Sequence, residues 1–275
     1  MTTGGEARRI RIGIGGWSYP PWRGTFYPPG LPQARELEHA SRHVTAIEIN
    51  ATYYRLQKPE SFAKWRDATP PGFVFSIKAS RYCTNRKALG EAADAVAGFV
   101  GQGITELGDK LGPILWQLMP TKTFDPEEIT AFLGLLPAQQ DGLQLRHAIE
   151  PRHESFRDAR FVALARKAGV AIVFADSADH PQIADLTCDF VYARLQRAEE
   201  EEPAGYAPEA LGRWAGVAEA WARGEAPTDL DYVAKGSASA PSRDVFLFMI
   251  NGAKVRAPAA AQALLKRLGE RPAAA

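Results

Sequence analysis

The chain has 275 residues, 45% of them hydrophobic and 24% charged, which is ordinary for a globular protein with room for a sizeable core. Its 33 basic and 32 acidic residues leave a net charge of +1, so no global field attracts nucleic acid or anionic lipid to the whole surface. Two distant cysteines, Cys83 and Cys188, argue against a disulfide framework and a structural zinc site. With neither a signal peptide nor a membrane span in the sequence, we expect a cytoplasmic protein.

Short β-rich runs alternate along the chain with longer amphipathic runs, as in repeated strand-helix units around a parallel sheet. Eight runs are predicted as strands: Ile10 to Gly16, Val44 to Ile49, Phe73 to Lys78, Gly112 to Leu118, Leu143 to Glu150, Val170 to Ala175, Phe190 to Leu195 and Val245 to Ile250. Helices are predicted to begin near Gln33, Pro59, Glu91, Pro126, Phe156, Pro208 and Arg256. This alternation predicts an α/β protein, a TIM-type parallel eight-stranded β/α barrel.

The predicted barrel has one weak point and two short tails. Only Pro181 to Leu186 could form a helical turn between the sixth and seventh strands, so the helix there is expected to be reduced. No linker divides the chain. We therefore predict one domain over residues 10–270, between tails of residues 1–9 and 271–275.

Two long loops are expected to lie on opposite ends of the barrel. Trp17 to Pro32 follows the first strand and carries five aromatic residues and five prolines, which is typical of a pocket wall. Glu225 to Arg243 precedes the eighth strand, at the end of a barrel where loops serve stability, and is expected to be mobile packing. Within the first strand, Gly13 and Gly15 are expected to let neighbouring elements pack closely.

The fifth predicted strand ends in a group of charged residues. Residues two apart share a strand face, so Glu150 and Arg152 project together. Pro151 is tolerated only where the ladder ends, which places this pair at the carboxyl end of the strand, the end at which parallel barrels bind ligands. Ser155 is predicted to cap the helix that follows.

The same alternation places polar side chains on the inward face of the other strands, near their carboxyl ends. With Arg81 from the loop after the third strand, four cations meet three carboxylates: Lys78, Arg81, Arg152 and Arg194 against Glu48, Glu150 and Asp176. A small phosphorylated or carboxylated molecule would balance this excess, since arginine suits both groups. The residues predicted to bind it are Trp17, Tyr19, Asn50, Arg81, Gln117, Arg152, His153, Asp176, Arg194 and Asn251.

Acid-base catalysis is predicted to rest on Lys78 with Glu48 or Glu150. Lys78 lies among arginines that disfavour its charged form, so it is a candidate base or Schiff-base amine. No cofactor and no metal is predicted, because the nearby cations would repel a metal from the only candidate ligands, Glu48, Glu150, Asp176 and His153.

Several alternatives remain open at this point. The inward charges could form a structural plug of paired ions, and Lys78 could be one member of such a salt bridge. The protein could instead bind or process nucleic acid, with the aromatic loop stacking bases and the arginines holding phosphates. It could also be a barrel that binds a ligand without turnover. The sequence leaves the substrate and the oligomeric state open, and it predicts no membrane partner.

A set of motifs along nearly the whole chain resembles the YecE-like family, catalogued as domain of unknown function 72. The motifs are Gly16-Trp-Ser-Tyr, Trp22-Arg-Gly, Phe26-Tyr-Pro, Glu48-Ile-Asn-Ala-Thr-Tyr-Tyr-Arg, Phe75-Ser-Ile-Lys-Ala-Ser-Arg-Tyr, Leu111-Gly-Pro, Gln117-Leu, Ala175-Asp-Ser and Phe190-Val-Tyr-Ala-Arg-Leu. The resemblance implies an eight-stranded barrel and no established activity.

The sequence departs from the family pattern at several positions that face the predicted site. The pattern has a histidine where Asn85 stands, a His-Gly pair where Gln196 and Arg197 stand, and an asparagine where Ile250 stands. Pro151 replaces the phenylalanine of a Glu-Phe-Arg-His form. This member is therefore expected either to have altered the chemistry of the family or to have kept only its binding surface.

Overall fold

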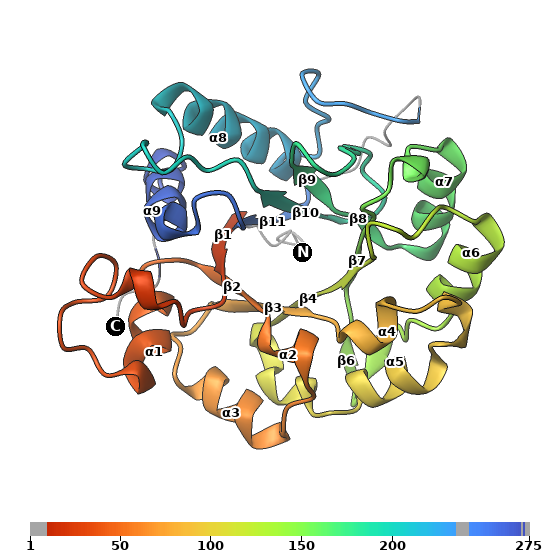
Figure 1. Cartoon of the computed structure of the whole chain (residues 1–275), viewed down its shortest axis with the longest axis horizontal. Coiled ribbons are helices and arrows are strands. Elements are labelled where there is room, and N and C mark those ends of the chain that lie inside the picture. The colour runs from red at the N-terminus through yellow and green to blue at the C-terminus, as the bar shows by residue number, and fades with distance from the viewer. Residues whose placement is uncertain (1–9, 235–241, 271, 273–275) are drawn as a thin grey trace, which may run out of the picture.

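A parallel sheet that curls into a barrel forms the centre of the computed structural model, which describes residues 10–234, 242–270 and 272 (Figure 1). Its strands are β1 (Ile10–Gly15), β2 (Ala46–Ile49), β3 (Val74–Lys78), β4 (Leu111–Gln117), β7 (His147–Glu150), β8 (Ala171–Ile172), β9 (Phe174–Asp176), β10 (Phe190–Leu195) and β11 (Asp244–Met249). They follow the order β8-β7-β4-β3-β2-β1-β11-β10-β9, and neighbouring strands pair in parallel.

The two ends of this sheet belong to one chain segment. Only Val173 separates β8 from β9, and its amide donates to the carbonyl of Ile149 (2.9 Å), so the barrel nearly closes on itself. Counted as one, β8 and β9 form the sixth of eight barrel strands. The predicted TIM-type fold is confirmed.

The predicted fifth strand is shorter than expected. β6 (Leu143–Gln144) pairs antiparallel with β5 (Gln139–Gln140) in a small hairpin, and only β7 joins the barrel. Asp141 and Gly142 form the turn, with φ of 46° and 81°. An Asp-Gly pair favours such a tight hairpin, a signal that the prediction of one continuous strand missed.

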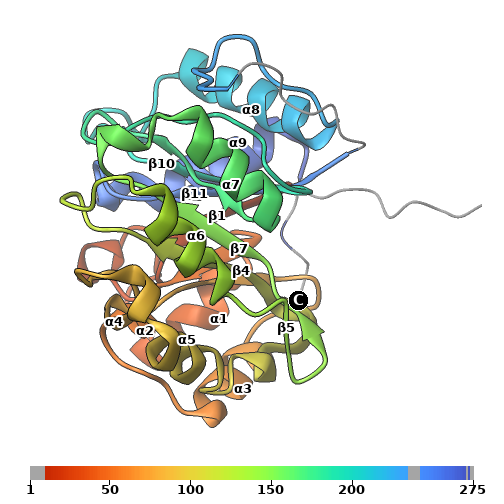
Figure 2. The same cartoon turned by 90° about the vertical axis from the view of Figure 1, so that its right-hand side faces the viewer.

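Seven helices, all longer than one turn, cover the outside of the barrel in the described part of the chain (Figures 1 and 2). They are α1 (Glu36–Ser41), α3 (Pro59–Asp67), α5 (Ala93–Val100), α6 (Pro126–Gly134), α7 (Ala159–Ala168), α8 (Pro208–Ala222) and α9 (Ala257–Arg267). Pro59, Pro126 and Pro208 open their helices as predicted, because proline suits the first helical position.

Short 3-10 turns account for the other predicted helix starts. η2 (Gln33–Arg35), η3 (Leu89–Glu91), η5 (Glu154–Phe156) and η6 (Lys254–Arg256) precede α1, α5, α7 and α9, while η1 (Pro20–Trp22) and η4 (Ile104–Lys110) lie elsewhere. The predicted cap of α7 was wrong: the Asp158 carboxylate accepts from the Arg160 amide, and Ser155 lies earlier, inside η5. Two one-turn helices, α2 (Ala51–Tyr54) and α4 (Arg81–Thr84), follow β2 and β3 and were not predicted.

The segment between β9 and β10 forms no helix, not even the turn considered at Pro181 to Leu186. A carboxylate holds it instead, because Asp185 accepts hydrogen bonds from the amides of Val233 (2.7 Å) and Ala234 (2.9 Å). The loop predicted over Glu225 to Arg243 lies partly outside the described residues. The predicted tails lie outside them except for residue 272.

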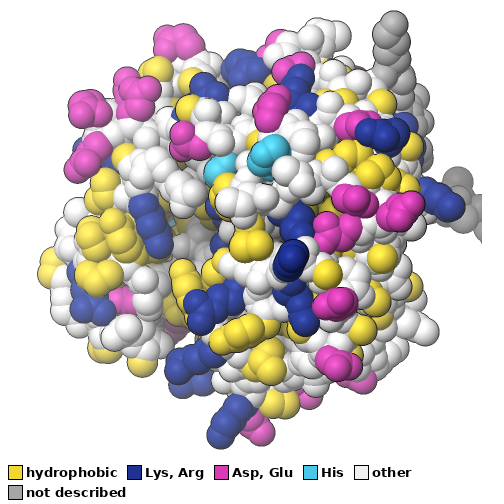
Figure 3. Space-filling view, turned by 45° about the vertical axis from the view of Figure 1, so that its right-hand side comes forward, with side chains coloured by type: hydrophobic (Ala, Val, Ile, Leu, Met, Phe, Trp, Pro, Cys, Tyr) yellow, Lys and Arg dark blue, Asp and Glu magenta, His cyan; other side chains and the backbone are white. Residues whose placement is uncertain are grey.

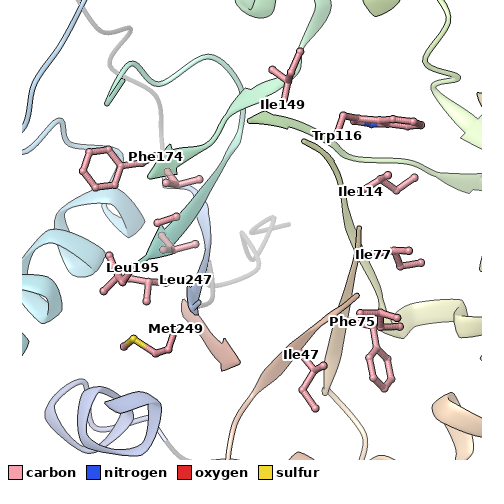
Figure 4. Close-up of a cluster of buried hydrophobic side chains, with 14 of the residues drawn as sticks. Ile47, Phe75, Ile77, Ile114, Trp116, Ile149, Phe174, Leu195, Leu247 and Met249 are labelled. Atoms are coloured by element: carbon pink, nitrogen blue, oxygen red, sulfur yellow. The ribbon is translucent and has the colours of Figure 1, made fainter. Parts of the chain in front are cut away.

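Charged side chains of both signs are spread over the visible surface, in keeping with the small net charge (Figure 3). None of the helices in the described ranges combines the length and the apolar character that a bilayer span requires. Beneath the surface, the strands point one set of apolar side chains outward, toward the helices (Figure 4). The labelled residues Ile47, Ile77, Ile149 and Leu247 belong to this outer layer.

A second apolar cluster fills the barrel interior, so the barrel is not a pore. Phe190, Tyr192, Phe246 and Phe248 supply most of its volume. Small residues make room for these rings. A Cβ on Gly13 would lie 2.4 Å from the carbonyl oxygen of Ala46 and 2.8 Å from the Phe248 ring, which confirms that close packing requires glycine there.

Candidate functional site

A cavity of about 570 Å³ lies at the carboxyl ends of the barrel strands. Seven residues predicted to form a site line it: Trp17, Asn50, Lys78, Gln117, Arg152, Arg194 and Asn251. The lining residues that were not predicted to bind include Trp22, Tyr54 and Lys254. The size suits a small metabolite.

The floor of the cavity is a buried ion triad formed by Glu48, Arg194 and Glu150. Arg194 Nε and Nη2 each donate to one carboxylate oxygen of Glu48 (both 3.1 Å). Its Nη1 donates to both oxygens of Glu150 (both 2.8 Å). The three side chains are at most 2% exposed. Strand parity explains the meeting, since β2, β7 and β10 point these residues inward.

Neutral groups complete the hydrogen bonding of the triad. Tyr192 donates to Glu48 (2.8 Å) and shares a hydrogen bond with Ser76 (2.7 Å), while Gln117 donates to Glu150 (2.5 Å). Burial alone would raise the pKa of Glu150, but the charges of Arg194 and Arg152 lower it to about 2. Glu150 is therefore an anion at neutral pH, and this part of the site is the paired-ion plug considered from the sequence.

Lys78 lies beside this triad without joining it. Its ammonium lies 4.3 Å from the ring centroid of Tyr53. Among the described residues, no carboxylate forms an ion pair with it. Burial lowers the pKa of Lys78 to about 8, together with the charge of Arg194 and against the pull of Glu48 and Glu150. The result is an amine that can lose its proton near neutral pH.

Arg152 is the second cation that the triad leaves largely unsatisfied. Its only ion pair within the described residues is a long contact from Nη2 to Glu150 (3.5 Å), and its buried Nε has no hydrogen-bond partner. The side chain is 17% exposed, so it is neither fully hydrated nor fully paired. A buried donor without a partner is costly, which makes an anion a favourable ligand here.

Lys254 is a third cation in the cavity wall, and no signal in the sequence predicted it. It follows β11 in η6, and its ammonium lies 4.7 Å from the ring centroid of Tyr19 and 5.8 Å from that of Trp22. Trp22 Nε1 in turn donates to the Lys254 carbonyl (2.9 Å). Trp17 and Trp22 thus form an aromatic wall of the cavity, as predicted. Tyr19 does not line the cavity itself but contacts the ammonium of Lys254.

The lining carries more positive than negative charge. Four cations line the cavity, Lys78, Arg152, Arg194 and Lys254, and the two carboxylates beneath them are Glu48 and Glu150. Subtracting two from four leaves an excess of two positive charges when every group is ionised. The excess predicted from the sequence therefore persists, although one of its cations is different.

Besides Tyr19, Glu48 and Glu150, which lie behind or beneath the lining, three predicted site residues lie outside it. Arg81 is exposed on α4, with its guanidinium 5.4 Å from the Tyr82 ring centroid. His153 accepts the Ser155 amide and caps η5. Asp176 pairs with Arg197 (3.1 Å), and burial raises the pKa of its carboxyl. Alternation along a strand does not predict where Arg81 and His153 point, because they lie in turns beyond the strand ends, whereas Asp176 ends β9 and is paired with Arg197.

The carboxylates and histidines of the described chain do not gather into a metal site. No group of three or more His, Cys, Asp or Glu within it is arranged to hold an ion. Of the positions that depart from the family pattern, Ile250 lines the cavity and Asn85 donates to the Tyr53 hydroxyl (3.1 Å). Gln196 accepts from Asn251 (3.3 Å), while Arg197 holds Asp176. Two of the changed positions thus contact the site: Asn85 through Tyr53, whose ring lies beside Lys78, and Gln196 through Asn251 of the lining.

A family model described as "Protein of unknown function DUF72" matches residues 11–275. Over 150 residues the chain is 32% identical to the UPF0759 protein YecE of Escherichia coli strain K12, covering 54% of this chain and 50% of YecE. Over 78 residues it is 31% identical to the UPF0759 protein YunF of Bacillus subtilis strain 168, covering 28% of this chain and 27% of YunF. The matches thus span half or less of these curated relatives.

Solved structures share the fold. A DUF72 family protein from Thermotoga maritima MSB8 aligns with a TM-score of 0.72 and 21% identity, covering 95% of this chain and 99% of that one. A structure described as SacUVDE aligns with a TM-score of 0.54 and 12% identity, covering 95% of this chain and all of that one. At these identities the likeness concerns the barrel alone.

Proposed function

This chain belongs to the DUF72 family, and from that premise we propose that it binds a small molecule with a phosphate or carboxylate group in the cavity at the carboxyl ends of its strands. The charge excess of the lining carries the proposal. Arg194 is neutralised by two carboxylates, whereas Lys78, Arg152 and Lys254 face the same cavity with little or no anionic partner. A bound anion would supply that partner.

Acid-base chemistry on the bound molecule would rest on Lys78. Its lowered pKa lets it accept or release a proton near neutral pH, which is what a general base needs. Glu150 is poorly suited to that role, because a carboxylate with a pKa of about 2 is too weak a base to hold a proton near neutral pH. We therefore assign Glu48 and Glu150 to holding Arg194 and to setting the field around Lys78.

Thermal unfolding in inorganic phosphate tests the binding proposal. A site-bound anion at about a hundred times its dissociation constant adds about 2.7 kcal/mol to the free energy of unfolding, which raises Tm by a few degrees in a chain of this size. The shift should saturate with concentration. A shift that only grows linearly, and is equal for the parent and for Arg152→Ala, would reflect general exclusion of phosphate from protein surfaces.

A second candidate function is binding of single-stranded nucleic acid, and one surface favours it. Tyr54, Leu56 and Tyr82 are the large hydrophobic side chains that stand exposed in the described chain, at 63%, 54% and 62%. They lie in the stretches 50–59 and 78–90, which contain six Lys or Arg and no Asp or Glu. Figure 3 likewise shows Lys and Arg gathered with hydrophobic side chains among them. Exposed tyrosines between cations can stack bases and hold phosphates.

Salt dependence separates the two candidates. Binding of a fluorescent oligonucleotide through several phosphates should weaken steeply with salt, with a logarithmic slope of about −0.7 per phosphate contacted. An enclosed site for a small anion should respond mildly. Tyr82→Ala should weaken the oligonucleotide and leave the phosphate shift unchanged if the exposed surface binds nucleic acid. Equal binding by the parent and this variant would remove the second candidate.

A reducing cytoplasm remains the proposed location. Cys83 and Cys188 are both free thiols, and burial raises the pKa of each to about 12, so neither is poised for disulfide chemistry.

A further inference from the structure

We infer that Lys78 forms a Schiff base with a small aldehyde or ketone whose carboxylate or phosphate group is held by Arg152. The inference rests on the proposed anion site and adds to it the class of substrate and the bond that forms. It follows from the surroundings of the four lysines that are buried or half-buried in the described chain, Lys78, Lys110, Lys122 and Lys254, which differ.

Lys110 and Lys122 are structural lysines. The Lys110 ammonium donates to the carbonyls of Arg66 and Thr69 (both 2.6 Å) and to the Thr69 hydroxyl (3.1 Å). Lys122 donates to the Lys87 carbonyl (2.6 Å) and to the Glu128 carboxylate (2.8 Å). Lys110 uses all three of its donors on these oxygen atoms and Lys122 uses two of its three, one of them in an ion pair, so both ammonium groups are held in place.

Lys78 has no such set of partners. In the described chain no oxygen accepts a hydrogen bond from its ammonium, which contacts only the face of the Tyr53 ring. It nevertheless lines the cavity, at the carboxyl end of β3. A half-buried amine without acceptors that faces a cavity is poorly placed for a structural role, but it is well placed to bond a ligand.

The surroundings of Lys78 favour the neutral amine that a carbonyl requires. Burial contributes most to the lowered pKa of Lys78, Arg194 and Arg152 lower it further, and Glu48 and Glu150 act against them. At pH 7 roughly a tenth of an amine with a pKa of about 8 is neutral, against well under a thousandth of an ordinary lysine. This supports a nucleophile that works without a separate base to activate it.

The bond changes are those of any imine formation. The lone pair of neutral Lys78 Nζ forms a bond to the carbonyl carbon, and the π electrons of the C=O bond move to oxygen, which takes up a proton. One proton leaves nitrogen, the hydroxyl oxygen takes up another, and water departs as nitrogen forms the C=N bond. Amine, carbonyl and one proton thus give a protonated imine and water, with no oxidant or reductant.

Arg152 explains why the carbonyl compound should be anionic. It lines the same cavity, and its buried Nε is a donor without a partner. Lys254 is the other lysine in the lining, and its ammonium lies over two rings, those of Tyr19 and Trp22, whereas that of Lys78 lies over one. An adduct on Lys254 in place of Lys78 would therefore contradict the inference.

Reductive trapping tests the inference. The full-length protein is incubated with glyoxylate, pyruvate, dihydroxyacetone phosphate or glyceraldehyde 3-phosphate and then with sodium borohydride. The protein is digested, and the masses of its peptides are measured by mass spectrometry. The borohydride hydride converts the imine to a stable secondary amine. With pyruvate, the peptide that contains Lys78 should gain the mass of pyruvic acid less one oxygen atom. The carboxylate and phosphate probes show which anionic group the site prefers.

Variants and competition make the result decisive. Lys78→Arg and Lys78→Met should lose the adduct, whereas Lys64→Met, at an exposed position on α3 outside the cavity lining, should keep it on Lys78. Should either Lys78 variant fail to fold, competition in the parent still decides, because inorganic phosphate should slow trapping at Lys78 and leave trapping at surface lysines unchanged. Adduct spread evenly over surface lysines, or none with all four probes, overturns the inference.

The same experiment keeps the two proposals apart. Lactate resembles pyruvate but has a hydroxyl group in place of the ketone. It cannot form an imine, so it reports anion binding alone. If lactate and phosphate raise Tm and no probe is trapped, the Schiff base is wrong and the anion site stands. If neither anion raises Tm and nothing is trapped, both proposals fail.

Discussion

Arg194 shows how much a single residue can contribute when two buried carboxylates depend on it. Its guanidinium supplies four of their hydrogen bonds. Arg194→Ala should lower the free energy of unfolding by about 3–5 kcal/mol, because it leaves buried charges uncompensated. Urea denaturation measures the change. Arg197→Ala is the control, since the Arg197 side chain is 49% exposed in its pair with Asp176, and its loss should cost at most about 1 kcal/mol.

Equal costs for Arg194→Ala and Arg197→Ala would mean that the triad is well hydrated and that the buried-plug description is wrong. A Glu150→Gln change in the Arg194→Ala background should then restore nothing, whereas in a dry triad it should recover part of the lost stability, because it removes a stranded charge.

Arg152 contrasts with Arg194, although both contact Glu150. Glu150 keeps Arg194 and Gln117 when Arg152 is removed, so Arg152→Ala should cost at most about 1 kcal/mol of stability. The same change should abolish the phosphate-dependent rise in Tm. Arg81→Ala is the matched control, because Arg81 is exposed and lies outside the cavity lining. Loss of the phosphate effect in Arg81→Ala, but not in Arg152→Ala, would place the anion on α4 instead.

If an anion binds as proposed, Lys78 should make its binding depend on pH. Sulfate does not titrate in this range, so its effect on Tm should fall as pH rises through about 8, where Lys78 loses its charge. Lys78→Arg should flatten this fall, since arginine stays charged. A sulfate effect with the same pH profile in parent and variant would exclude Lys78 from the anion site.

Without sulfate, the stability linked to Lys78 should change with pH in the opposite direction. The pKa of Lys78 is lower in the folded protein than in the unfolded chain, so the unfolded chain binds more protons between about pH 8 and the ordinary value of 10.5. Stability linked to this group should therefore rise with pH across that window, and Lys78→Met should remove the rise. Urea denaturation at several pH values measures it.

At the scale of single elements, β1 depends on the absence of a side chain at Gly13. Gly13→Ala would place a Cβ 2.4 Å from the Ala46 carbonyl oxygen on β2, a backbone atom that cannot rotate away. Overpacking of this kind costs about 1–3 kcal/mol or more, which thermal unfolding would detect.

Gly98 in α5 is the control for Gly13. It is exposed, and nothing lies within 4 Å of a Cβ built there. Gly98→Ala should therefore stabilise the protein by up to about 1 kcal/mol through helix propensity. If both changes destabilise equally, the close contact between β1 and β2 relaxes more easily than the geometry indicates.

At the scale of the whole molecule, the nearly closed barrel should unfold as one unit, because every strand between β8 and β9, the two ends of the sheet, pairs on both sides. Cys83 on α4 and Cys188 before β10 report on distant parts of it. Both should react slowly with a thiol reagent at pH 8, because burial raises the pKa of each to about 12. In increasing urea they should become reactive together, at the global transition. Reaction of Cys83 alone at low urea would reveal local opening of α4.

The sequence by itself determined which side chains face the barrel interior. The period of two along a strand sends Glu48, Lys78, Glu150 and Arg194 inward, and the count of eight strands requires their carboxyl ends to meet. The barrel, the aromatic wall and the charge excess could therefore be predicted from local pattern alone, and the family resemblance agreed with them.

Only the tertiary structure decided which charges are neutralised and which stay available. The alternation of side chains gives the face of a strand on which a residue lies but not its height along the barrel axis. In the folded barrel Arg194 meets two carboxylates, while Lys78 and Arg152 lie beside this triad. Turns beyond the strand ends carry Arg81 and His153 away, because their direction depends on local caps. Lys254 reaches the cavity by packing against Trp22, 232 residues earlier, and no local pattern encodes a contact of that range.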